Sequence, residues 1–403
     1  MTEEDFGSEF GFRMGNEFGF RTRAVHAGDG IDRETWAVRR PITMANSYQL
    51  PYDATGSNWS SAEGMLYTRN GGTNQFYLEQ KLAALEGCKD CVVLSSGVAA
   101  LSGLFFSLLR SGDHVICSRI TCIAVYRLLG ELFNKKFNVE TTMVDTSDLD
   151  EVREAIRPNT KLIHVETPAN PTLLVSDIRA IAEIAHSNNV LLSVDNTLAS
   201  PYNQRPIELG ADFCVESLTK YINGHGDAMG GAVIGTTKLL QPIRLQAQVN
   251  LGGTISPFNA WLIMRGAVTL PFRMKQHNES AMQIAKFLEN ESKVKFVSYP
   301  GLKSHRQHDI AASQMSPGFG GVVTFGLKTP QCMQKLFISK LKIITSAVSL
   351  GDDESLIVLI GEHDERQYLY PTSCYNGFFR LSVGLEDVED LINDLRQALA
   401  TVF

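Results

Sequence analysis

The sequence has few positive charges and no long apolar run. Its 37 Lys and Arg residues are outnumbered by 44 Asp and Glu residues, which gives a formal net charge of −7 at pH 7. This balance argues against nucleic acid and anionic membranes as partners. No apolar stretch reaches the roughly 20 residues that cross a bilayer, and the opening MTEEDFGSEF is acidic, unlike a secretion signal. We therefore expect a soluble, cytoplasmic protein.

Cysteine is sparse, and its count is odd. Seven cysteines in 403 residues do not suggest a disulfide framework, which fits a reducing compartment. Cys88 and Cys91 form one C-x-x-C pair, but no second pair completes a four-ligand zinc site, and we expect no metal. The chain also lacks G-x-G-x-x-G after its first strand-like run and any G-x-x-x-x-G-K-[ST] motif, which weakens the alternative of a nucleotide-binding enzyme.

Hydrophobic patterning between about residues 90 and 235 predicts an α/β fold. Short apolar runs typical of strands alternate with amphipathic stretches typical of helices, such as 98–110 and 177–189. This alternation predicts a mostly parallel sheet with helices on both faces. The runs interpreted as strands are CVVL, HVIC, VETTMVD, KLIHVE, VLLSVD, DFCVES and GGAVIG.

The pattern changes near residue 255. A long helical pattern (256–290), four strand-like runs and a last helix (387–402) predict a second, smaller α+β domain. The beginning of the chain is rich in Gly, Asn and Ser, which is typical of an extended arm stabilised by a neighbouring subunit. We therefore divide the chain into an N-terminal arm (1–62), a large domain (63–254) and a C-terminal small domain (255–403).

Several predicted strands end in an acid, and a lysine lies in the turn after one of them. Asp145, Glu166, Asp195 and Glu216 follow or close apolar runs, and Lys220 comes soon after the last. Ligands of such sheets bind beyond the carboxyl ends of the strands, so we expect these side chains to meet in one crevice. A helix cap or a turn would explain any one acid, but not their recurrence.

Lys220 and Asp195 together suit pyridoxal 5′-phosphate. A lysine can form a Schiff base with the aldehyde of this cofactor, and a buried carboxylate keeps its pyridine nitrogen protonated. The segment LSSGVAAL (94–101) offers a strand, a small-residue turn and a helix N-terminus for the phosphate. Ser217 and Thr219 add hydroxyl groups.

Five ordered motifs resemble the Cys/Met-metabolism family of pyridoxal phosphate enzymes, which includes methionine γ-lyase, cystathionine γ-lyase and O-acetylhomoserine sulfhydrylase. The resemblance runs from about residue 19 to the C-terminus. It implies an aminotransferase-like α/β architecture of fold type I, in which the large domain has a mostly parallel, seven-stranded sheet. The motifs are VETPANPT (165–172), VDNTLASP (194–201), SLTKYINGHGD (217–227), AVSLGDDESL (347–356) and FFRLSVGLED (378–387).

The resemblance implies a role for each matching residue. Lys220 would bind the cofactor and later carry protons, Asp195 would pair with the pyridine nitrogen, and Arg380, helped by Ser349, would bind the substrate α-carboxylate. Other cofactor contacts would come from Ser96, Gly97, Val98, Asn170, Thr197, Ser217 and Thr219, and from Tyr67 and Arg69 of an adjacent subunit. The active site would then need at least a dimer, and the family is usually a homotetramer.

The implied substrate is an L-amino acid with a leaving group at Cγ. Loss of the α-proton, a β-proton and then the γ-substituent precedes two outcomes. Return of water and protons gives a 2-oxo acid and ammonia, as in a γ-lyase, whereas an external nucleophile gives a new amino acid, as in a γ-replacement transferase. We expect the lyase, with methionine-like or non-sulfur substrates such as canavanine. The alternatives are the transferase and a catalytically silent scaffold.

Two segments depart from the family pattern. Where relatives commonly have a tyrosine in Y-G-x-T, this chain has Cys122 in SRITCIAVYRLL. We hypothesise that Cys122, or Tyr126 one helical turn on, takes part of that catalytic role, or that the leaving group needs less protonation than a thiolate. A Cys122 that only packs beside the ring is the alternative. After AVSLGDDESL, the segment IVLIGEHDERQYLYPTSCYNG replaces the usual His-Pro and Thr-His residues, which leaves the substrate side chain open.

Three further features bear on that side chain. Val348 stands where cystathionine-processing members tend to have a glutamate, which argues against cystathionine. Glu362, Asp364 and Glu365 in the altered segment leave a cationic side chain open. The stretch ISPFNAWLIMRG resembles sulfhydrylases and favours the transferase alternative.

Overall fold

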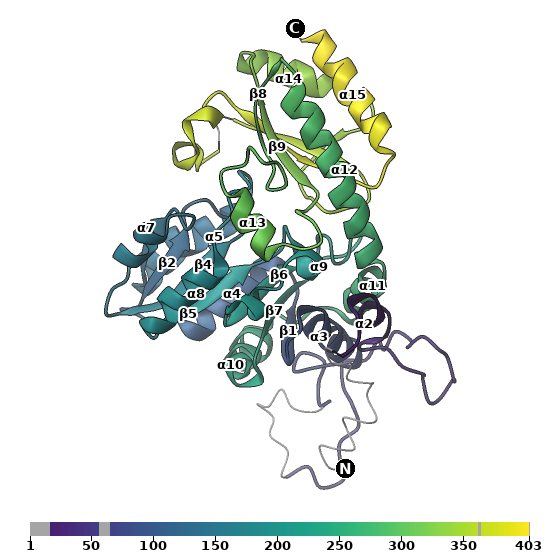
Figure 1. Cartoon of the computed structure of the whole chain (residues 1–403). Helices are drawn as coiled ribbons and strands as arrows, with labels where there is room; N and C mark the ends of the chain where they lie inside the picture. Colours follow the sequence, from purple (N-terminus) through teal and green to yellow (C-terminus); the bar gives the residue numbers. More distant parts are fainter. Residues whose placement is uncertain (1–16, 56–64, 362–363, 403) are drawn as a thin grey trace.

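A mostly parallel sheet of seven strands forms the first of two sheets in the chain (Figure 1). The computed structural model describes residues 17–55, 65–361 and 364–402. The strand order is β1-β7-β6-β5-β4-β2-β3, and β7 alone runs antiparallel to its neighbours. The strands are β1 (Asp90–Leu94), β2 (His114–Ser118), β3 (Glu140–Val144), β4 (Thr160–Glu166), β5 (Leu191–Asp195), β6 (Phe213–Ser217) and β7 (Gly231–Gly235). All seven predicted runs are confirmed as strands.

Helices cover both faces of this sheet. Buried side chains of α4, α10 and η3 pack against one face, and those of α3, α8 and α11 pack against the other. The elements up to residue 250 are α2 (Phe20–His26), α3 (Thr73–Glu86), α4 (Gly97–Leu108), α5 (Ile123–Arg127), η1 (Leu128–Phe133), α6 (Asn134–Phe137), α7 (Leu149–Glu154), α8 (Ile178–Ser187), α9 (Ser200–Asn203), η2 (Pro206–Leu209), α10 (Thr237–Ile243) and η3 (Arg244–Asn250).

Helix α8 shows why these segments fold as they do. Its apolar residues recur at three and four spacing, so Ile178, Ile181 and Ala185 lie on one buried face against the sheet. Asp177 precedes it and accepts a hydrogen bond at 3.0 Å from the backbone N–H of Ala180, which satisfies a donor that the first turn leaves free.

The second sheet has five strands in the order β10-β11-β12-β9-β8. These are β8 (Val294–Ser298), β9 (Val322–Leu327), β10 (Thr345–Ser346), β11 (Leu356–Ile360) and β12 (Phe378–Ser382). The helices here are α11 (Pro257–Val268), α12 (Leu270–Asn290), α13 (His308–Gln314), α14 (Gln331–Lys340), η4 (Gln367–Leu369), η5 (Thr372–Cys374) and α15 (Val388–Thr401). The predicted fold class, a seven-stranded mostly parallel sheet plus a smaller α+β part, is confirmed; the domain boundaries stay a prediction.

Two details in this half differ from the sequence prediction. The single helix predicted over 256–290 is two helices, because the chain breaks at Thr269 and α12 restarts with Pro271 in its first turn. The run IITSAVSLG contributes only the two-residue strand β10, whereas β11 was not predicted. Strand β11 is the apolar run LIVLI, and it pairs with its neighbours in the chain, β10 and β12.

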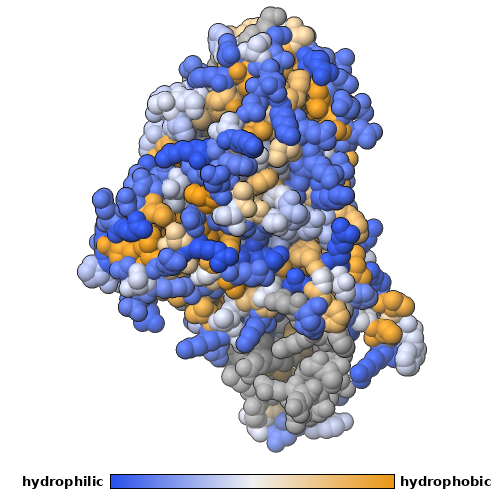
Figure 2. All heavy atoms as spheres, viewed as in Figure 1, coloured by the Kyte–Doolittle hydropathy of each residue, from blue (hydrophilic) through white to orange (hydrophobic). Residues whose placement is uncertain are grey.

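The described part of the N-terminal arm lies beside the large sheet and α11. Helix α2 packs against α3 and α11, and the loop after it protrudes from the molecule (Figure 1). Apolar side chains gather on that loop (Figure 2). Among the residues that the structure describes, no helix has the length and apolar character needed to span a membrane.

Candidate active site

The turn between β1 and α4 forms a tight cradle with the ends of two other strands. The hydroxyl of Ser96 caps α4 by accepting the N–H of Ala99 at 3.1 Å. A Cβ on Gly97 would lie 2.9 Å from the Cβ of Ser217, and a Cβ on Gly231 would lie 2.1 Å from the carbonyl oxygen of Ser96. The first N–H groups of α4 have no acceptor within the helix, so this cradle suits an anion such as a phosphate.

Further predicted cofactor contacts lie beside this cradle. Thr197 accepts the backbone N–H of Ser217 at 2.9 Å through its hydroxyl. The hydroxyl of Thr219 donates to the carbonyl of Gly230 at 3.3 Å and accepts its N–H at 3.2 Å. Val98 has a half-exposed side chain at the start of α4. The sequence therefore placed these residues in one region, and their roles toward a cofactor stay a prediction.

Lys220 follows β6 in a turn that points its amine toward the second half of the chain. Its Nζ donates a hydrogen bond of 2.9 Å to the hydroxyl of Ser349. Burial lowers the pKa of Lys220, and the positive charge of Arg380 adds to this, whereas Asp352 acts in the opposite direction. A lowered pKa raises the fraction of neutral amine near pH 7, which is the form that attacks an aldehyde or accepts a proton.

Asp195 and Glu166 lie side by side at the carboxyl ends of β5 and β4. They are register partners on neighbouring parallel strands, so both side chains project from the same face of the sheet. Burial raises the pKa of Asp195 and raises that of Glu166 to about 7, and the two acids also repel each other. Neither forms a salt bridge within the described residues. Two such buried acids fit a cationic ring nitrogen, which would favour the ionised form of its neighbour.

The other two strand-end acids point elsewhere. The carboxylate of Asp145 accepts the N–H and hydroxyl of Ser147 at 2.9 and 2.7 Å, as an acid in a turn does. Glu216 projects from the opposite face of the sheet and accepts a hydrogen bond from Asn196 at 2.9 Å. Its carboxylate, that of Glu86 and the Cys214 thiol have ligand-type atoms within 4.8 Å of one another, all buried. The expected meeting of four acids in one crevice is therefore wrong for these two.

Arg380 connects the lysine side of the site to Asn170. Its guanidinium donates to the carbonyl oxygen of Ser349 at 2.8 Å and to the amide oxygen of Asn170 at 3.1 Å. Its buried Nε donates to none of the described residues. Ser349 holds a φ of 94°, a strained value for a non-glycine residue, and so turns both its carbonyl and its hydroxyl into the site. A planar cation with a spare donor is suited to a carboxylate.

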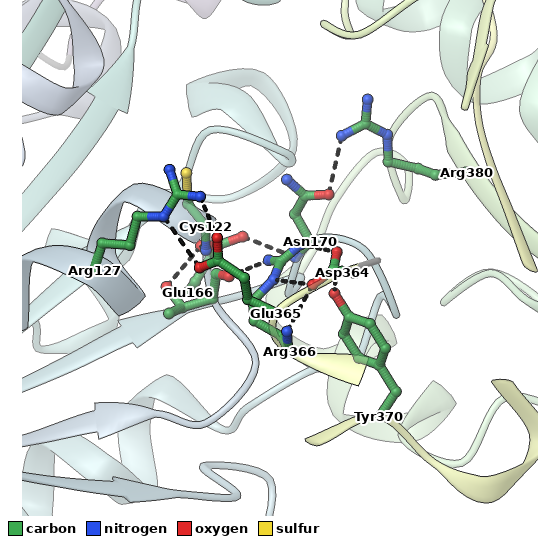
Figure 3. Close-up of polar contacts among 10 residues, drawn as sticks. Cys122, Arg127, Glu166, Asn170, Asp364, Glu365, Arg366, Tyr370 and Arg380 are labelled. Carbon is green, nitrogen blue, oxygen red and sulfur yellow. Dashed lines mark hydrogen bonds and ion pairs between the residues drawn. The ribbon is translucent and has the colours of Figure 1, made fainter. Parts of the chain in front are cut away.

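Cys122 stands at the start of α5, where Glu166 fixes its backbone. Oε2 of Glu166 accepts the N–H of Cys122 at 2.6 Å and the hydroxyl of Thr121 at 2.9 Å, and Oε1 accepts the N–H of Asn170 at 2.8 Å (Figure 3). Burial and the acids nearby raise the pKa of Cys122 to about 11. The thiol therefore keeps its proton at neutral pH.

Tyr126 lies farther out, on the solvent side of α5. Its hydroxyl shares a hydrogen bond of 2.5 Å with that of Tyr368, and this bond is the main cause that raises the pKa of Tyr126 to about 12. The phenol therefore keeps its proton at neutral pH. The catalytic roles predicted for Cys122 and Tyr126 stay predictions.

Tyr67 and Arg69 do not contact the lysine side of the described chain. The ring of Tyr67 is 43% exposed and lies 5.1 Å from the Arg69 guanidinium. The intervening Thr68 bonds to Asn46 and is contacted by Thr254. Their predicted place in the site of an adjacent subunit stays a prediction.

Two site residues were missed by the sequence reasoning. Asp352 is close enough to Lys220 to oppose the lowering of its pKa, and its own pKa is raised by burial. Arg366 donates to the carbonyl of Thr121 at 2.6 Å from a segment without a recognised motif. The GDD turn after an apolar run was a signal for Asp352, whereas nothing local announced Arg366.

Comparison with known proteins identifies the family. The family model described as Cys/Met metabolism PLP-dependent enzyme matches residues 21–400. The chain belongs to this family. Its cofactor is pyridoxal 5′-phosphate, which the cradle at α4, the lowered pKa of Lys220 and the paired acids Asp195 and Glu166 fit.

The relatives are named for several γ-lyase activities, on canavanine, methionine and cystathionine. Canavanine gamma-lyase of Pseudomonas canavaninivorans is 54% identical over 385 residues, which cover 95% of this chain and 96% of that protein. Canavanine gamma-lyase of Rhizobium leguminosarum bv. trifolii is 52% identical and covers 95% of this chain and 96% of that protein. The crystal structure of metB from Corynebacterium glutamicum matches with a TM-score of 0.89 at 39% identity, covering 96% of this chain and 99% of that one. The protein is thus a lyase of this family.

Proposed function

We propose that this protein catalyses γ-elimination from canavanine, an amino acid with a guanidine attached through oxygen at Cγ. The observation that carries the proposal is the similarity to canavanine γ-lyases over nearly the whole of both chains. Cleavage of the Cγ–O bond releases hydroxyguanidine. Uptake of water by the remaining four-carbon unit then gives 2-oxobutanoate and ammonia.

The residues of the lysine side would divide the work in the following way. Bound pyridoxal 5′-phosphate supplies the electron sink that allows protons to leave Cα and Cβ. The neutral amine of Lys220 would accept these protons and return them later. Arg380 would hold the α-carboxylate with its spare Nε donor, while the carbonyl of Ser349 keeps the guanidinium in place. Asp195 would supply the negative charge opposite the ring nitrogen.

Cys122 would act at the leaving group. Its pKa of about 11 keeps the thiol protonated, so it has a proton to donate to the departing oxygen. The backbone N–H of Cys122 is held by Glu166, which fixes the backbone from which the thiol projects. Packing beside the ring without proton donation is the alternative, and the two differ in the rate of γ-release.

We assign the guanidine of the substrate to the tyrosine pair rather than to the acids of the altered segment. Asp364 is paired with Arg366, and Glu365 is paired with Arg127. Glu362 lies outside the described residues. Tyr126 and Tyr368 offer two phenol oxygens as acceptors and two ring faces for a planar cation.

The assembly would complete the site. We propose a dimer in which Tyr67 and Arg69 of one subunit reach the phosphate cradle of the other, two dimers forming a homotetramer in the cytoplasm. Exposed apolar side chains on the arm loop support a covered surface there: Trp36 and Val38 are each 77% exposed and Met44 is 71% exposed. Mixing subunits with Lys220→Ala and subunits with Arg69→Ala tests this, because a shared site regenerates one intact centre per mixed dimer.

The decisive experiment is a substrate panel followed by mass spectrometry. Cofactor-loaded enzyme is incubated with canavanine, methionine, homocysteine, O-acetylhomoserine or cystathionine, with and without an added thiol. Hydroxyguanidine and a 2-oxo acid from canavanine are expected. A thiol-bearing amino acid formed only from O-acetylhomoserine would instead establish the γ-replacement transferase, and the proposed function would be wrong.

A further inference from the structure

The segment 364–370, here called the substrate-end segment, is fixed by a fully engaged buried arginine. Nε and one terminal nitrogen of Arg366 donate to the two carboxylate oxygens of Asp364 at 3.1 and 2.8 Å. The other terminal nitrogen donates to the carbonyl of Thr121 at 2.6 Å. Tyr370 donates to the same carboxylate of Asp364 at 3.0 Å. The Arg366 side chain is only 9% exposed, so all of these bonds are shielded from water (Figure 3).

The turn that Arg366 grips is held from its other side by Glu166. Glu166 accepts the Thr121 hydroxyl, the Cys122 N–H and the Asn170 N–H, and Asn170 in turn accepts a bond from Arg380. A continuous series of hydrogen bonds therefore runs from the substrate-end segment to the carboxylate-binding arginine. The segment joins this series at the backbone carbonyl of Thr121.

We propose that Arg366 is a positioning residue for the γ-elimination: it clamps the Thr121–Cys122 turn against Glu166 and so sets where the Cys122 thiol lies. The assignment rests on the proposed function for its kinetic readout and on the contacts above for its geometry. Arg366 donates in three directions from one rigid plane, which the single ammonium of a lysine cannot reproduce. The clamp belongs to the segment in which this chain departs from its family, and it acts through the residue that replaces the usual tyrosine.

A second arginine joins the same two segments but lacks this geometry. Arg127 pairs with Glu365, its Nε donating at 3.1 Å, and both side chains are about half exposed. Exposed ion pairs of this kind contribute roughly 0–1 kcal/mol. Within the described residues, Arg127 forms no hydrogen bond or ion pair with Thr121 or Glu166, which makes Arg127→Gln a matched control for Arg366→Lys.

The test separates two steps of the reaction. Exchange of the substrate α-proton with solvent deuterium reports Lys220, whereas release of the γ-group reports the Cys122 side as well. Arg366→Lys should lower the rate of γ-release roughly 10- to 100-fold, because a displacement near 1 Å can cost that much, while α-exchange stays within about threefold. Arg127→Gln should leave both rates near those of the parent enzyme. Equal loss of both rates in Arg366→Lys would show a general structural role and overturn the proposal.

A measurement that does not depend on turnover distinguishes failure of the Arg366 proposal from failure of the proposed function. Alkylation of Cys122, followed by peptide mass spectrometry, should become about tenfold faster in Arg366→Lys and change less than about twofold in Arg127→Gln. Lysine retains the positive charge, so the change reports position and not the loss of a neighbouring cation. An unchanged alkylation rate in Arg366→Lys would overturn the positioning role. Absence of γ-release from the parent enzyme would instead refute the proposed function while leaving this readout intact.

Discussion

The cofactor end and the substrate end of the site are built in different ways. Lys220 and Asp195 follow neighbouring strands, β6 and β5, whose register brings their carboxyl ends together. The substrate end is held by Arg366, which reaches a carbonyl 245 positions earlier in the chain through a segment with little regular structure. A sheet edge places side chains by a rule of the fold, whereas a long-range clamp places them by contacts between individual side chains and a distant segment of the backbone. The fold should therefore fix the cofactor end, and individual residues should tune the substrate end.

The largest effect should come from the cofactor end, with Asp195→Asn. An amide cannot carry the negative charge that a cationic ring nitrogen needs, so turnover should fall about 10³-fold or more. Asp145→Asn is the control, since Asp145 also follows a strand of the large sheet, but its carboxylate bonds to Ser147 within its own turn. Steady-state rates and the absorbance of the bound cofactor would measure both. Equal losses in the two variants would contradict the assignment of Asp195 alone.

Arg380→Lys should have the next largest effect. A lysine keeps the charge but cannot reproduce the planar guanidinium, with its Nε donor and its bonds to Asn170 and Ser349, so KM for the amino acid should rise roughly 10- to 100-fold while kcat changes less. Ser349 keeps Arg380 in place through a carbonyl, which no substitution of its side chain removes. Initial-rate kinetics over a wide range of canavanine concentration would check this. A fall in kcat with unchanged KM would argue that Arg380 acts on the chemistry and not on binding.

At the substrate end, substitutions of Cys122 and Tyr126 should have different kinetic effects. Cys122→Ala should slow γ-release roughly 10- to 100-fold if the thiol, with its pKa of about 11, donates the proton to the leaving oxygen. Tyr126→Phe should raise KM for canavanine about threefold and leave kcat nearly unchanged, because its phenol is assigned to binding. Rate measurements on canavanine and methionine would compare them. Unchanged turnover in both variants would exclude a direct role for either residue.

The cofactor end could be predicted from the sequence better than the substrate end. The alternation of apolar runs predicted all seven strands of the large sheet, and the strand-end rule placed Asp195 and Lys220 at one edge. The same rule misplaced Glu216, because side chains of successive residues point to opposite faces and its strand phase sends it away from the site. Alternation along β6 was visible in the sequence, but the face that carries the cofactor was not.

The substrate end was recognised only as a departure from the family. Nothing in GEHDERQYLYP predicts that Arg366 bonds to Thr121. That contact depends on how the connection between β11 and β12 reaches the residues that follow β2 of the large sheet. The acids there suggested binding of a cation, yet the described ones are paired with arginines of the same chain. A local pattern gives the charge of a residue but not its partner.

The smallest predicted effect concerns the acid that the strand-end rule misplaced. Burial raises the pKa of Glu86 to about 7 and raises that of Glu216, its neighbour on the far face of the sheet. Because the folded-state pKa lies above the unfolded value, this pair stabilises the fold fully below about pH 4.5, and the contribution is lost as pH rises through about 7. Glu86→Gln replaces one of the two titrating carboxyl groups with an amide that does not titrate. The parent Tm minus the variant Tm should therefore fall by roughly 1–3 °C between pH 5 and pH 8.5. A Tm difference for Glu86→Gln that stays constant with pH would mean that Glu86 is ionised in the folded state over this whole range. A positive charge beyond that of Arg205 would then have to lie near this carboxylate.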